Sequence, residues 1–384
     1  MEFIAAYFIP FVIVLTILVF VHELGHYLIA KRNGVRVEVF SIGFGPEIFG
    51  WTDKDQTRWR FSVIPLGGYV RMFGDADESS KPDGEKLKQM SAEDKAASLH
   101  HKTPLQRIAV SFGGPLANFL FALAIMAPLF MYKGAPIQPA VVGKVLENSA
   151  AQKAGLQEKD KIIKIDGQLV ERVRKLRSMI TESSSEKLTF TVVRGEGEVA
   201  ETFDVAISPI VYDSEGNKTD KRMIGVAFYP VIEYKPIEWY QAPAIAVKEI
   251  YTMCADTLKA VGEMIVRKRS SDQLGGIVSI GQMAGDSMRG GALTLLMFMA
   301  ILSVNLGLIN LFPIPVLDGG HILFATIEAI IGRPVPEKVQ EYAFIAGALV
   351  VLGLIVLTTA NDLSRLTFMQ DIIAGIKNML GMGA

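Results

Sequence analysis

Two histidines and a glutamate stand together in the segment His22-Glu23-Leu24-Gly25-His26. On a helix, residues four apart lie on one face, so His22 and His26 can present their imidazoles to a single metal ion. Glu23 is rotated away from that face, where it can take a proton from a water molecule at the metal. Imidazole ligands and hydrolytic chemistry both suit zinc. The segment therefore predicts a hydrolytic zinc site.

The surroundings of this segment argue against a chance match. Residues 4–21 are apolar apart from Thr16, which is the composition of a segment buried in lipid. Ionisable residues inside such a span are costly and indicate function by default. His22 precedes Lys31 by about 14 Å at the rise of an α-helix. The metal is therefore expected inside the membrane, nearer the end of the span that Lys31 marks.

A zinc site of this kind needs a third protein ligand, and the best candidate is Asp318 in the segment NLFPIPVLDGG, residues 310–320. Pro313 and Pro315 cannot continue a helix, so we expect a break there and a turn that brings Asp318 back toward the metal. Spacing alone equally supports an ordinary turn aspartate before two glycines. Asn310 could donate a hydrogen bond to a developing oxyanion, or it could join two helices.

The whole chain has the composition of a membrane protein. Half of its 384 residues are hydrophobic, and the mean hydropathy of +0.32 is high for a soluble protein. The 39 basic and 40 acidic residues nearly balance, so the charge gives no reason to propose nucleic acid as a partner. The single cysteine, Cys254, excludes an internal disulfide and a cysteine-based zinc cluster.

Four segments approach the length of about 20 residues that a helix needs to cross a bilayer: residues 4–30, 108–132, 292–312 and 343–360. The first lacks a basic region before it and a clean cleavage site after it, so we interpret it as a retained span. Lys31 and Arg32 follow the first span, and Arg107 precedes the second, which places these ends in the cytosol. The two termini and residues 133–290 are then expected on the other side.

The connections between the spans carry their own patterns. Residues 35–74 are β-rich, with alternating side chains and Gly-Pro punctuation, and predict hairpins beside the site. Gly43 and Gly45 would permit close backbone approach there. Residues 75–102 are polar and predict a mobile loop in which His100 and His101 are exposed to solvent. Residues 136 to about 230 alternate strand and short-helix patterns and predict a soluble domain, and residues 237–270 predict an amphipathic helix.

Small residues and one polar residue interrupt the second span at Gly113-Gly114-Pro115-Leu116-Ala117-Asn118. Small side chains let two helices approach closely, so we expect Gly113 and Gly114 to serve mainly in packing. Asn118 is a polar side chain in a lipid environment and is a candidate for a functional contact.

The motif HELGH near the end of a first span, paired with N-x-x-P-x-P-x-L-D-G after a third, resembles the site-2 protease family of zinc intramembrane metalloproteases. The resemblance is closest to the bacterial RseP-like (regulator of sigma-E protease) branch and covers nearly the whole chain. It implies one Zn²⁺ ion with His22, His26 and Asp318 as ligands. It also implies Glu23 as general base and Asn310 as a contact to the transition state or substrate.

The resemblance further implies how substrate is held. A membrane-dipping β-hairpin would pair with the unwound substrate as an added strand, although an ordinary small sheet remains an equal alternative. Gly43, Gly45 and Asn118 are the expected substrate contacts. The pattern A-G-L-x-x-x-D-x-I-x-x-I-D-G in residues 154–167 resembles a PDZ domain, which binds an extended peptide along a sheet edge and here would filter substrates. The branch often carries two PDZ domains in tandem, whereas this chain has room for one.

The implied reaction is hydrolysis of a peptide bond inside a transmembrane helix. Implied partners are the lipid bilayer of the bacterial inner membrane and single-pass substrates, such as anti-sigma factors already cut by an upstream site-1 protease, or remnant signal peptides. The alternative is a membrane-anchored PDZ scaffold or chaperone whose metal site is structural or inactive. A structural zinc site is closed by four protein ligands, and only three are convincing here.

The expected fold is an α-helical integral membrane protein with about four transmembrane helices, a membrane-associated β-hairpin region and one extracytoplasmic PDZ-like α+β domain. The expected parts are residues 1–34 (first span with HELGH), 35–104 (β region and mobile loop), 105–132 (second span), 133–232 (PDZ-like domain), 233–290 (amphipathic linker), 291–340 (third span and NxxPxPxLDG turn) and 341–384 (fourth span and C-terminal tail).

Overall fold

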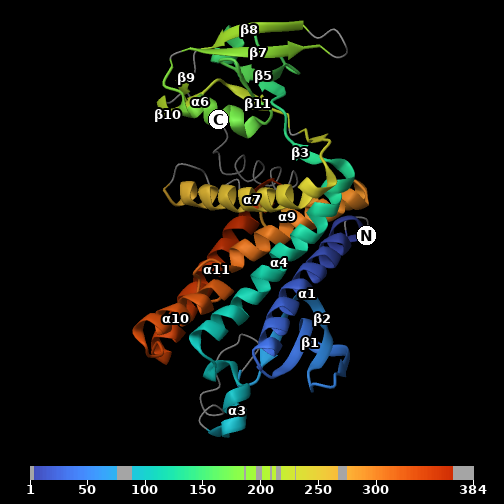
Figure 1. Cartoon of the computed structure of the whole chain (residues 1–384), viewed down its shortest axis with the longest axis vertical. Coiled ribbons are helices and arrows are strands. Elements are labelled where there is room, and N and C mark those ends of the chain that lie inside the picture. Colours follow the sequence, from blue (N-terminus) through green and yellow to red (C-terminus); the bar gives the residue numbers. More distant parts are fainter. Residues whose placement is uncertain are drawn as a thin grey trace, which may run out of the picture. The chain divides into compact units, whose positions relative to one another are not determined.

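The computed structural model describes residues 4–75, 89–185, 187–195, 201–207, 210–212, 218–229, 231–266 and 275–365 (Figure 1). It contains two compact units. The helical unit comprises Met1–Pro128 and Pro243–Ala384, and the second unit comprises Leu129–Ala242. Much of the predicted mobile loop, the end of the amphipathic stretch and the predicted C-terminal tail (residues 76–88, 267–274 and 366–384) lie outside the described residues.

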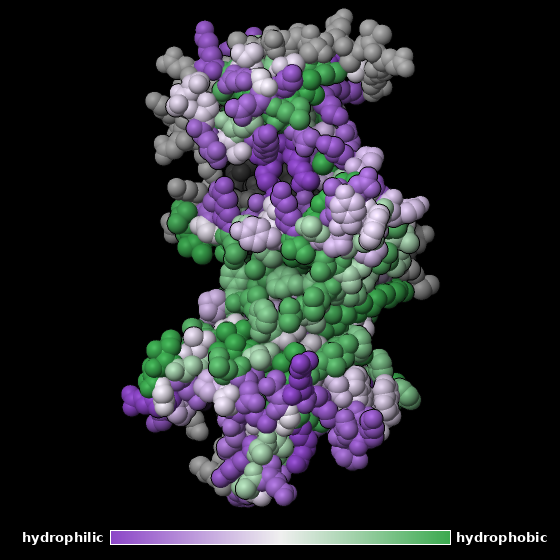
Figure 2. Space-filling model, viewed as in Figure 1, coloured by the Kyte–Doolittle hydropathy of each residue, from purple (hydrophilic) through white to green (hydrophobic). Residues whose placement is uncertain are grey.

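Four helices in the described part of the chain are long and apolar enough to cross a membrane, which confirms the four predicted spans. They are α1 (Ile9–Arg32, after a π-helical turn at Ile4–Phe8), α4 (Pro104–Lys133), α9 (Ala292–Asn310) and α11 (Glu337–Arg365). Helices α1 and α9 carry apolar residues on every face, as expected for helices in lipid. Figure 2 shows apolar side chains gathered over this bundle.

The predicted β region is a hairpin of two long antiparallel strands, β1 (Val37–Thr52) and β2 (Arg58–Met72), which lies alongside α1 (Figure 1). Each strand bends, so that residues 39–42 pair with residues 68–71 on one side and with residues 58–61 on the other. Residues 49–52 pair with residues 58–61 as well. The hairpin therefore folds back on itself, and residues 68–72 and 49–52 form its two edges.

Glycines with positive φ make these bends possible. Gly43 and Gly45 have φ of 91° and 87°, a region that favours glycine because other residues clash there. A Cβ atom on Gly43 would also lie 2.8 Å from the carbonyl oxygen of Ile64. The sheet thus has its own need for Gly43, separate from any contact with substrate.

The hairpin follows α1 over more than half of the helix. At one end, Lys31 forms a 3.0 Å ion pair with Asp55, in the turn between the strands. At the other, a Cβ atom on Gly68 would lie 2.9 Å from Val19 Cγ1 and 3.4 Å from Glu23 Cγ. The hairpin therefore extends from the charged end of α1 to the level of the HELGH motif.

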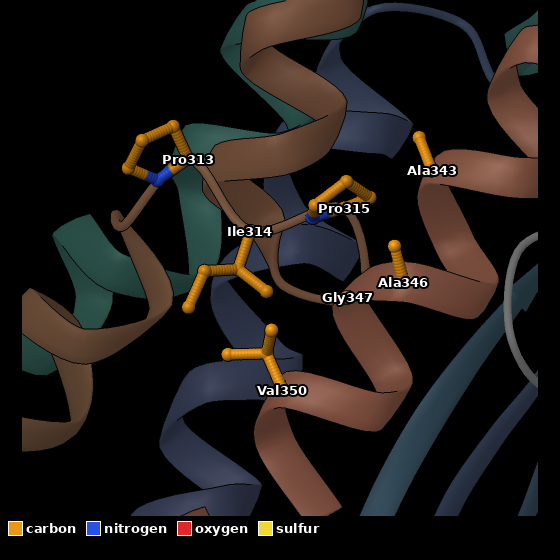
Figure 3. Close-up of a pocket in the computed structure, with 7 residues that line it drawn as sticks. All are labelled: Pro313, Ile314, Pro315, Ala343, Ala346, Gly347 and Val350. Atoms are coloured by element: carbon orange, nitrogen blue, oxygen red, sulfur yellow. The ribbon is translucent and has the colours of Figure 1, made fainter. Parts of the chain in front are cut away.

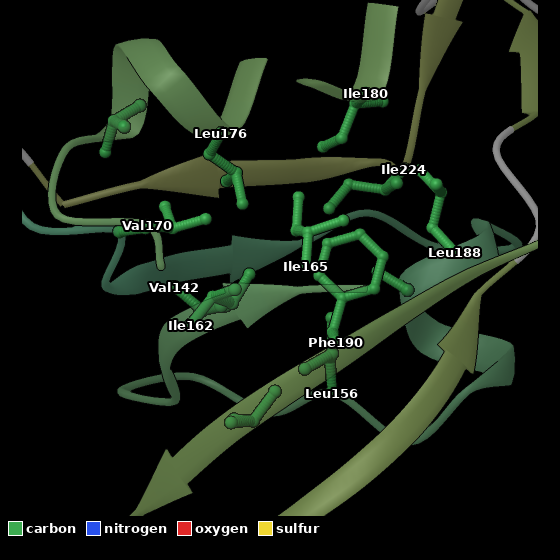
Figure 4. Close-up of a cluster of buried hydrophobic side chains, with 14 of the residues drawn as sticks. Val142, Leu156, Ile162, Ile165, Val170, Leu176, Ile180, Leu188, Phe190 and Ile224 are labelled. Carbon is green, nitrogen blue, oxygen red and sulfur yellow. The ribbon is translucent and has the colours of Figure 1, made fainter. Parts of the chain in front are cut away.

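The second unit contains a four-stranded sheet in the order β6-β5-β7-β8, with helix α6 (Val173–Glu182) beside it. The strands are β5 (Lys161–Ile165), β6 (Gln168–Leu169), β7 (Leu188–Arg194) and β8 (Glu201–Ile207). Leu176 of α6 packs with Ile165 and Phe190 in its hydrophobic core (Figure 4). The predicted alternation of strands and a short helix is confirmed by β4 (Val142–Val145), α5 (Ala150–Lys153) and β5, and the next two long strands, β7 and β8, form an antiparallel hairpin.

Short strand pairs complete this unit. They are β3 (Ala135–Ile137) with β12 (Glu233–Lys235), β4 with β11 (Val226–Phe228), and β9 (Ile210–Tyr212) with β10 (Lys218–Met223).

A bidentate ion pair stabilises the second unit. Arg194 Nε and Nη2 each lie 2.7 Å from a carboxylate oxygen of Asp160, whose side chain is fully buried. Arg194→Ala would leave that buried charge unpaired, and we expect a loss of about 2–3 kcal/mol, below the usual cost because Arg194 is partly exposed. Pulse proteolysis of the full chain across a urea series, followed at sites within residues 129–242, measures this loss.

Lys235→Ala is the matched control, since it breaks an ion pair with Glu171 in which both side chains are half exposed. Exposed pairs contribute little, so the control should leave the urea midpoint almost unchanged. Equal midpoints for the two variants would show that the Asp160 pair does not stabilise the unit.

The other α-helices in the described part of the helical unit are α3 (Ala92–Ala97), α7 (Ala242–Ile265), α8 (Ile277–Arg289) and α10 (Asp318–Ile331). Helix α7 confirms the helical pattern predicted for residues 237–270. Helix α10 corrects an expectation, because the predicted turn at Asp318 is the first turn of this helix. A Cβ atom on Gly319 would lie 2.2 Å from the carbonyl oxygen of Phe312, so the glycine is required where the preceding segment folds back onto α10.

In the described part of the chain, helix α11 contacts the other helices at several places, one of them the ring contacts of Phe344 with His321 and Phe324 of α10. Near its C-terminal end, Asp362 accepts hydrogen bonds of 3.0 Å from the backbone N–H groups of Gly276 and Ser279, and so caps the start of α8. Nearer its start, Gly347 passes Pro315, where a Cβ atom would lie 3.1 Å from Pro315 Cδ. An apolar groove lies between α11 and the Pro313–Pro315 segment (Figure 3). Most other side chains of α11 are exposed.

Candidate metal centre

Three side chains from distant parts of the chain converge inside the helical unit. His22 and His26 come from α1, and Asp318 is the first residue of α10. The two Nε2 atoms are 3.2 Å apart, and Asp318 places one carboxylate oxygen 3.1 Å from His22 Nε2 and the other 3.3 Å from His26 Nε2. Within the described residues, this is the one group of three His, Cys, Asp or Glu side chains close enough to hold a metal ion.

The spacing of these atoms fits zinc. Ligand atoms at bond lengths of about 2.0–2.1 Å around a tetrahedral zinc ion lie roughly 3.3 Å from one another. Two imidazole nitrogens and a carboxylate suit zinc chemically, and three protein ligands leave a fourth position for a reacting group. Both histidines are buried, so bulk water cannot separate their facing nitrogen atoms. The residues present therefore fit a catalytic zinc ion.

Helix α4 forms the wall behind the two imidazoles. His26 Nδ1 lies 2.8 Å from the backbone carbonyl oxygen of Val110, so its N–H donates there and Nε2 is free to bind metal. Asn118 places its amide Nδ2 3.1 Å from His22 Nδ1. Both contacts fall on the ring nitrogen opposite the metal-facing one, which is where groups that orient histidine ligands usually lie.

Gly114 lies between those two contacts, and its role differs from the packing role expected from the sequence. A Cβ atom on Gly114 would lie 2.4 Å from His26 Nε2 and 2.7 Å from His22 Nε2. The neighbouring Gly113 does serve in packing, because a Cβ atom there would lie 2.7 Å from the carbonyl oxygen of Gly25 on α1. Gly114 therefore leaves the space that the metal-facing nitrogens need.

Glu23 lies beside this cluster without belonging to it. Its Cγ atom approaches Gly68 of β2, and the backbone amide of Val70 hydrogen-bonds with its carboxylate. The side chain is thus directed toward the edge of the hairpin formed by residues 68–72. This position suits a proton acceptor that acts next to the ligands and not as one of them.

The other sequence candidates lie in different surroundings. Asn310 is the last residue of α9 and is partly buried, just before the break at Pro313. Gly43 and Gly45 lie in the bends of the hairpin. The roles proposed for these three residues toward substrate stay predictions. Asn118 is fully buried against His22, a position in the wall of the metal site.

One histidine outside the cluster differs from expectation. His100 was predicted to be exposed, but its Nε2 lies 2.9 Å from a carboxylate oxygen of the buried Asp75. Asp75 also accepts a hydrogen bond from the backbone N–H of Met72, so this pair fastens the segment after β2. Local sequence patterns could not predict this contact, because the two partners are 25 residues apart.

Comparison with known proteins gives consistent matches along the chain. The model for peptidase family M50 matches residues 10–354. A protein of Agrobacterium fabrum named "putative zinc metalloprotease" is 42% identical over 370 residues, which is 95% of this chain and 97% of the relative. A protein of the same name from Rickettsia conorii is 37% identical over 363 residues, 93% and 98% of the two chains. The metalloprotease MmpA of Caulobacter vibrioides is 32% identical over 378 residues, 92% and 94%.

Proposed function

The chain belongs to peptidase family M50 and is a zinc metalloprotease of the membrane, and from this premise we propose that it cuts peptide bonds within transmembrane helices of its substrates. One observation carries the proposal. His22, His26 and Asp318 meet among helices that are apolar enough to cross a membrane, at a distance from the charged end of α1. A protease with its metal ligands at that depth would act on peptide bonds that other proteases cannot reach.

We propose that His22, His26 and Asp318 hold a single zinc ion. Zinc bound there would supply Lewis acidity that polarises the scissile carbonyl group. Glu23 takes a proton from the attacking water and gives it to the leaving amine, since a base that accepts a proton in the first half of the reaction can return it in the second. Asn310 is proposed to donate a hydrogen bond to the oxygen on which negative charge develops.

The hairpin offers an edge strand with which an unwound substrate can pair. A helix has no free backbone hydrogen-bonding groups, so a substrate helix must unwind and find new partners before it can be cut. The edge at residues 68–72 passes beside Glu23, so a peptide added to that edge would run past the base. Gly43 and Gly45 shape the bend of the same sheet and are proposed to let the peptide approach closely.

Apolar side chains on the hairpin agree with a membrane-dipping position. Ile48, Phe49 and Ile64 are large and exposed, although they belong to a two-strand element that carries several charged residues elsewhere. Exposed apolar residues grouped in this way usually mark a surface that meets lipid or a partner. We propose that this part of the hairpin enters the cytosolic leaflet next to α1.

The second unit is proposed to be a single PDZ-like domain that filters substrates outside the cytosol. Its support is the A-G-L-x-x-x-D-x-I-x-x-I-D-G pattern, which begins directly after α5 and covers β5, and a sheet with the short strand β6 at one edge. The proposed substrates are single-pass membrane proteins, such as anti-sigma factors shortened by a site-1 protease, or remnant signal peptides. The proposed location is the bacterial inner membrane, with both termini outside the cytosol and the metal nearer the cytosolic face.

Removal of the metal tests the proposal. The full chain, reconstituted in liposomes with a single-pass reporter, should cut within the reporter's transmembrane segment and hold one zinc per chain by elemental analysis. Chelation should lower the rate by at least about 100-fold, because several kcal/mol of charge stabilisation leaves with the metal, and added zinc should restore it.

The scaffold or chaperone alternative predicts a different result. A zinc-containing chain that cuts none of several reporters, with and without a shortened extracytoplasmic part, would favour it. Cleavage that survives complete zinc removal would show that the metal is structural.

A further inference from the structure

Helix α4 meets the two histidines of α1 with one face. Val110, Gly114 and Asn118 follow one another at intervals of four residues, so they lie along one side of the helix. Val110 contacts His26, Gly114 lies opposite both metal-facing nitrogens, and Asn118 contacts His22. The i and i+4 spacing of the histidines on α1 is thus matched by the same spacing on α4, which runs in the opposite direction.

Asn118 is enclosed where three helices meet. Its side chain faces His22 on α1, and its backbone carbonyl accepts a 2.9 Å hydrogen bond from Ser303 on α9. Asn118 and Ser303 are both fully buried, and Gly307 of α9 packs against the same part of α4, with a built Cβ 3.3 Å from Asn118 Cβ. A substrate could reach this amide only after the helices separate.

The hydrogen bond between Asn118 and His22 depends on which end of the Asn118 amide, the NH₂ group or the oxygen, faces the imidazole. A neutral His22 that binds zinc through Nε2 carries its proton on Nδ1, and that N–H needs an acceptor. Asn118 Oδ1 is buried and has no hydrogen-bond partner in the described part of the chain. A half-turn about the Cβ–Cγ bond exchanges the two ends of the amide and brings Oδ1 to His22 Nδ1.

We propose that Asn118 is a positioning residue for the metal site and not a substrate contact. Its amide oxygen accepts the Nδ1 proton of His22 and so keeps Nε2 directed at the metal, as the Val110 carbonyl does for His26. The inference rests on the proposed zinc site and adds to it the group that orients one of its ligands. Partners of this kind usually change metal affinity by about 10- to 100-fold when they are removed.

Three variants of the full chain test this role. Asn118→Leu keeps the volume and removes the acceptor, and Asn118→Asp keeps an oxygen acceptor in the same place. Ser303→Ala is the matched control, because it removes the hydrogen bond to the Asn118 carbonyl and leaves the amide intact. Zinc affinity is measured by competition with a chromophoric chelator, and the geometry of the site by the visible spectrum after cobalt substitution.

The leucine variant should bind zinc about 10- to 100-fold more weakly, with an altered cobalt spectrum, while the aspartate variant and Ser303→Ala stay within about threefold of the parent. At saturating zinc, the KM for the reporter should be unchanged in the leucine variant. A raised KM with unchanged zinc affinity and cobalt spectrum would overturn the proposal and return Asn118 to the substrate site.

Two controls keep the result interpretable. If the leucine variant does not fold, the aspartate variant decides: zinc binding no more than about threefold weaker than that of the parent supports the proposal, and a larger loss overturns it. If the parent itself binds no zinc, the proposed function fails together with this inference, whereas a zinc-binding parent with a zinc-tight leucine variant contradicts only the role of Asn118.

Discussion

Glu23→Gln is expected to lower kcat for cleavage of a transmembrane reporter by about 10²–10⁴-fold, the usual contribution of a general base. An amide has nearly the same shape as the carboxylate but cannot take the proton of the attacking water. The zinc content should remain that of the parent, because Glu23 is directed toward Gly68 and Val70 of β2 and is not one of the three ligands. Single-turnover cleavage in liposomes, with zinc measured on the same sample, gives both quantities.

Glu93→Gln is the matched control, since it makes the same chemical change on an exposed side chain of α3. Its kcat and zinc content should equal those of the parent. If Glu23→Gln loses zinc, Glu23 contributes to holding the metal. If it keeps both zinc and activity, the base is a different group, and the proposed mechanism fails at this step.

Gly114→Ala is expected to weaken zinc binding by more than about 100-fold, beyond the usual effect of groups around the ligands, because its methyl group would occupy the ligand side of the imidazoles. The Cβ atom would lie 2.4 Å from His26 Nε2, much closer than a carbon and a nitrogen can approach without a covalent bond. Helix α4 cannot move away easily, since Gly25 and Gly113 bring the backbones of α1 and α4 into direct contact one residue earlier. Chelator competition on the purified full chain measures the loss.

Gly353→Ala is the matched control for this change. Gly353 lies in the helical α11 with no atom within 4 Å of a built Cβ, so the same substitution should leave zinc binding unchanged. Helix propensity rises equally in both variants, so it cannot explain a difference in zinc affinity between them. Normal zinc affinity in Gly114→Ala would mean that the imidazoles bind metal from another direction and would contradict the site described above.

The metal centre was partly predictable because some of its geometry is local. His22 and His26 share a helical face through their spacing, and the apolar run before them predicted the span that became α1. Asp318 required a break after α9, and the two prolines supplied a reason for one. Its place in the first turn of α10 was missed, because two glycines after an aspartate are typical of turns and the close backbone contact at Gly319 cannot be read from the chain.

The residues of α4 that line the metal site could not be predicted from local sequence patterns. Val110 and Asn118 are 84 and 96 residues from the histidines they contact, and their meeting depends on how α1 and α4 are rotated against each other. Gly114 and Asn118, four residues apart in the second span, match the spacing of His22 and His26 in the first, but such a match selects a rotation only if the two helices are known to be neighbours.

In the β region, too, the local features were predictable and the long-range pairing was not. Alternation of side chains and turn residues predicted the strands, because these are properties of neighbouring residues. The folding back of β1 and β2 into a curled sheet was not predictable, since it depends on pairing between segments that share no periodic signal. The glycines indicate only a place where bending is easy, and no local pattern shows that the sheet itself requires Gly43.

Because much of the described part of α11 is exposed, its packing depends on the lipid that surrounds it. Helices α1 and α4 pack closely against each other at Gly25 and Gly113, whereas most described side chains of α11 are exposed, and in a bilayer most of its van der Waals partners are acyl chains. Acyl chains differ in length and order from one membrane to another, and detergents differ from all of them. The lipid that accompanies this protein through purification is therefore as much a packing partner of α11 as the Pro313–Pro315 segment.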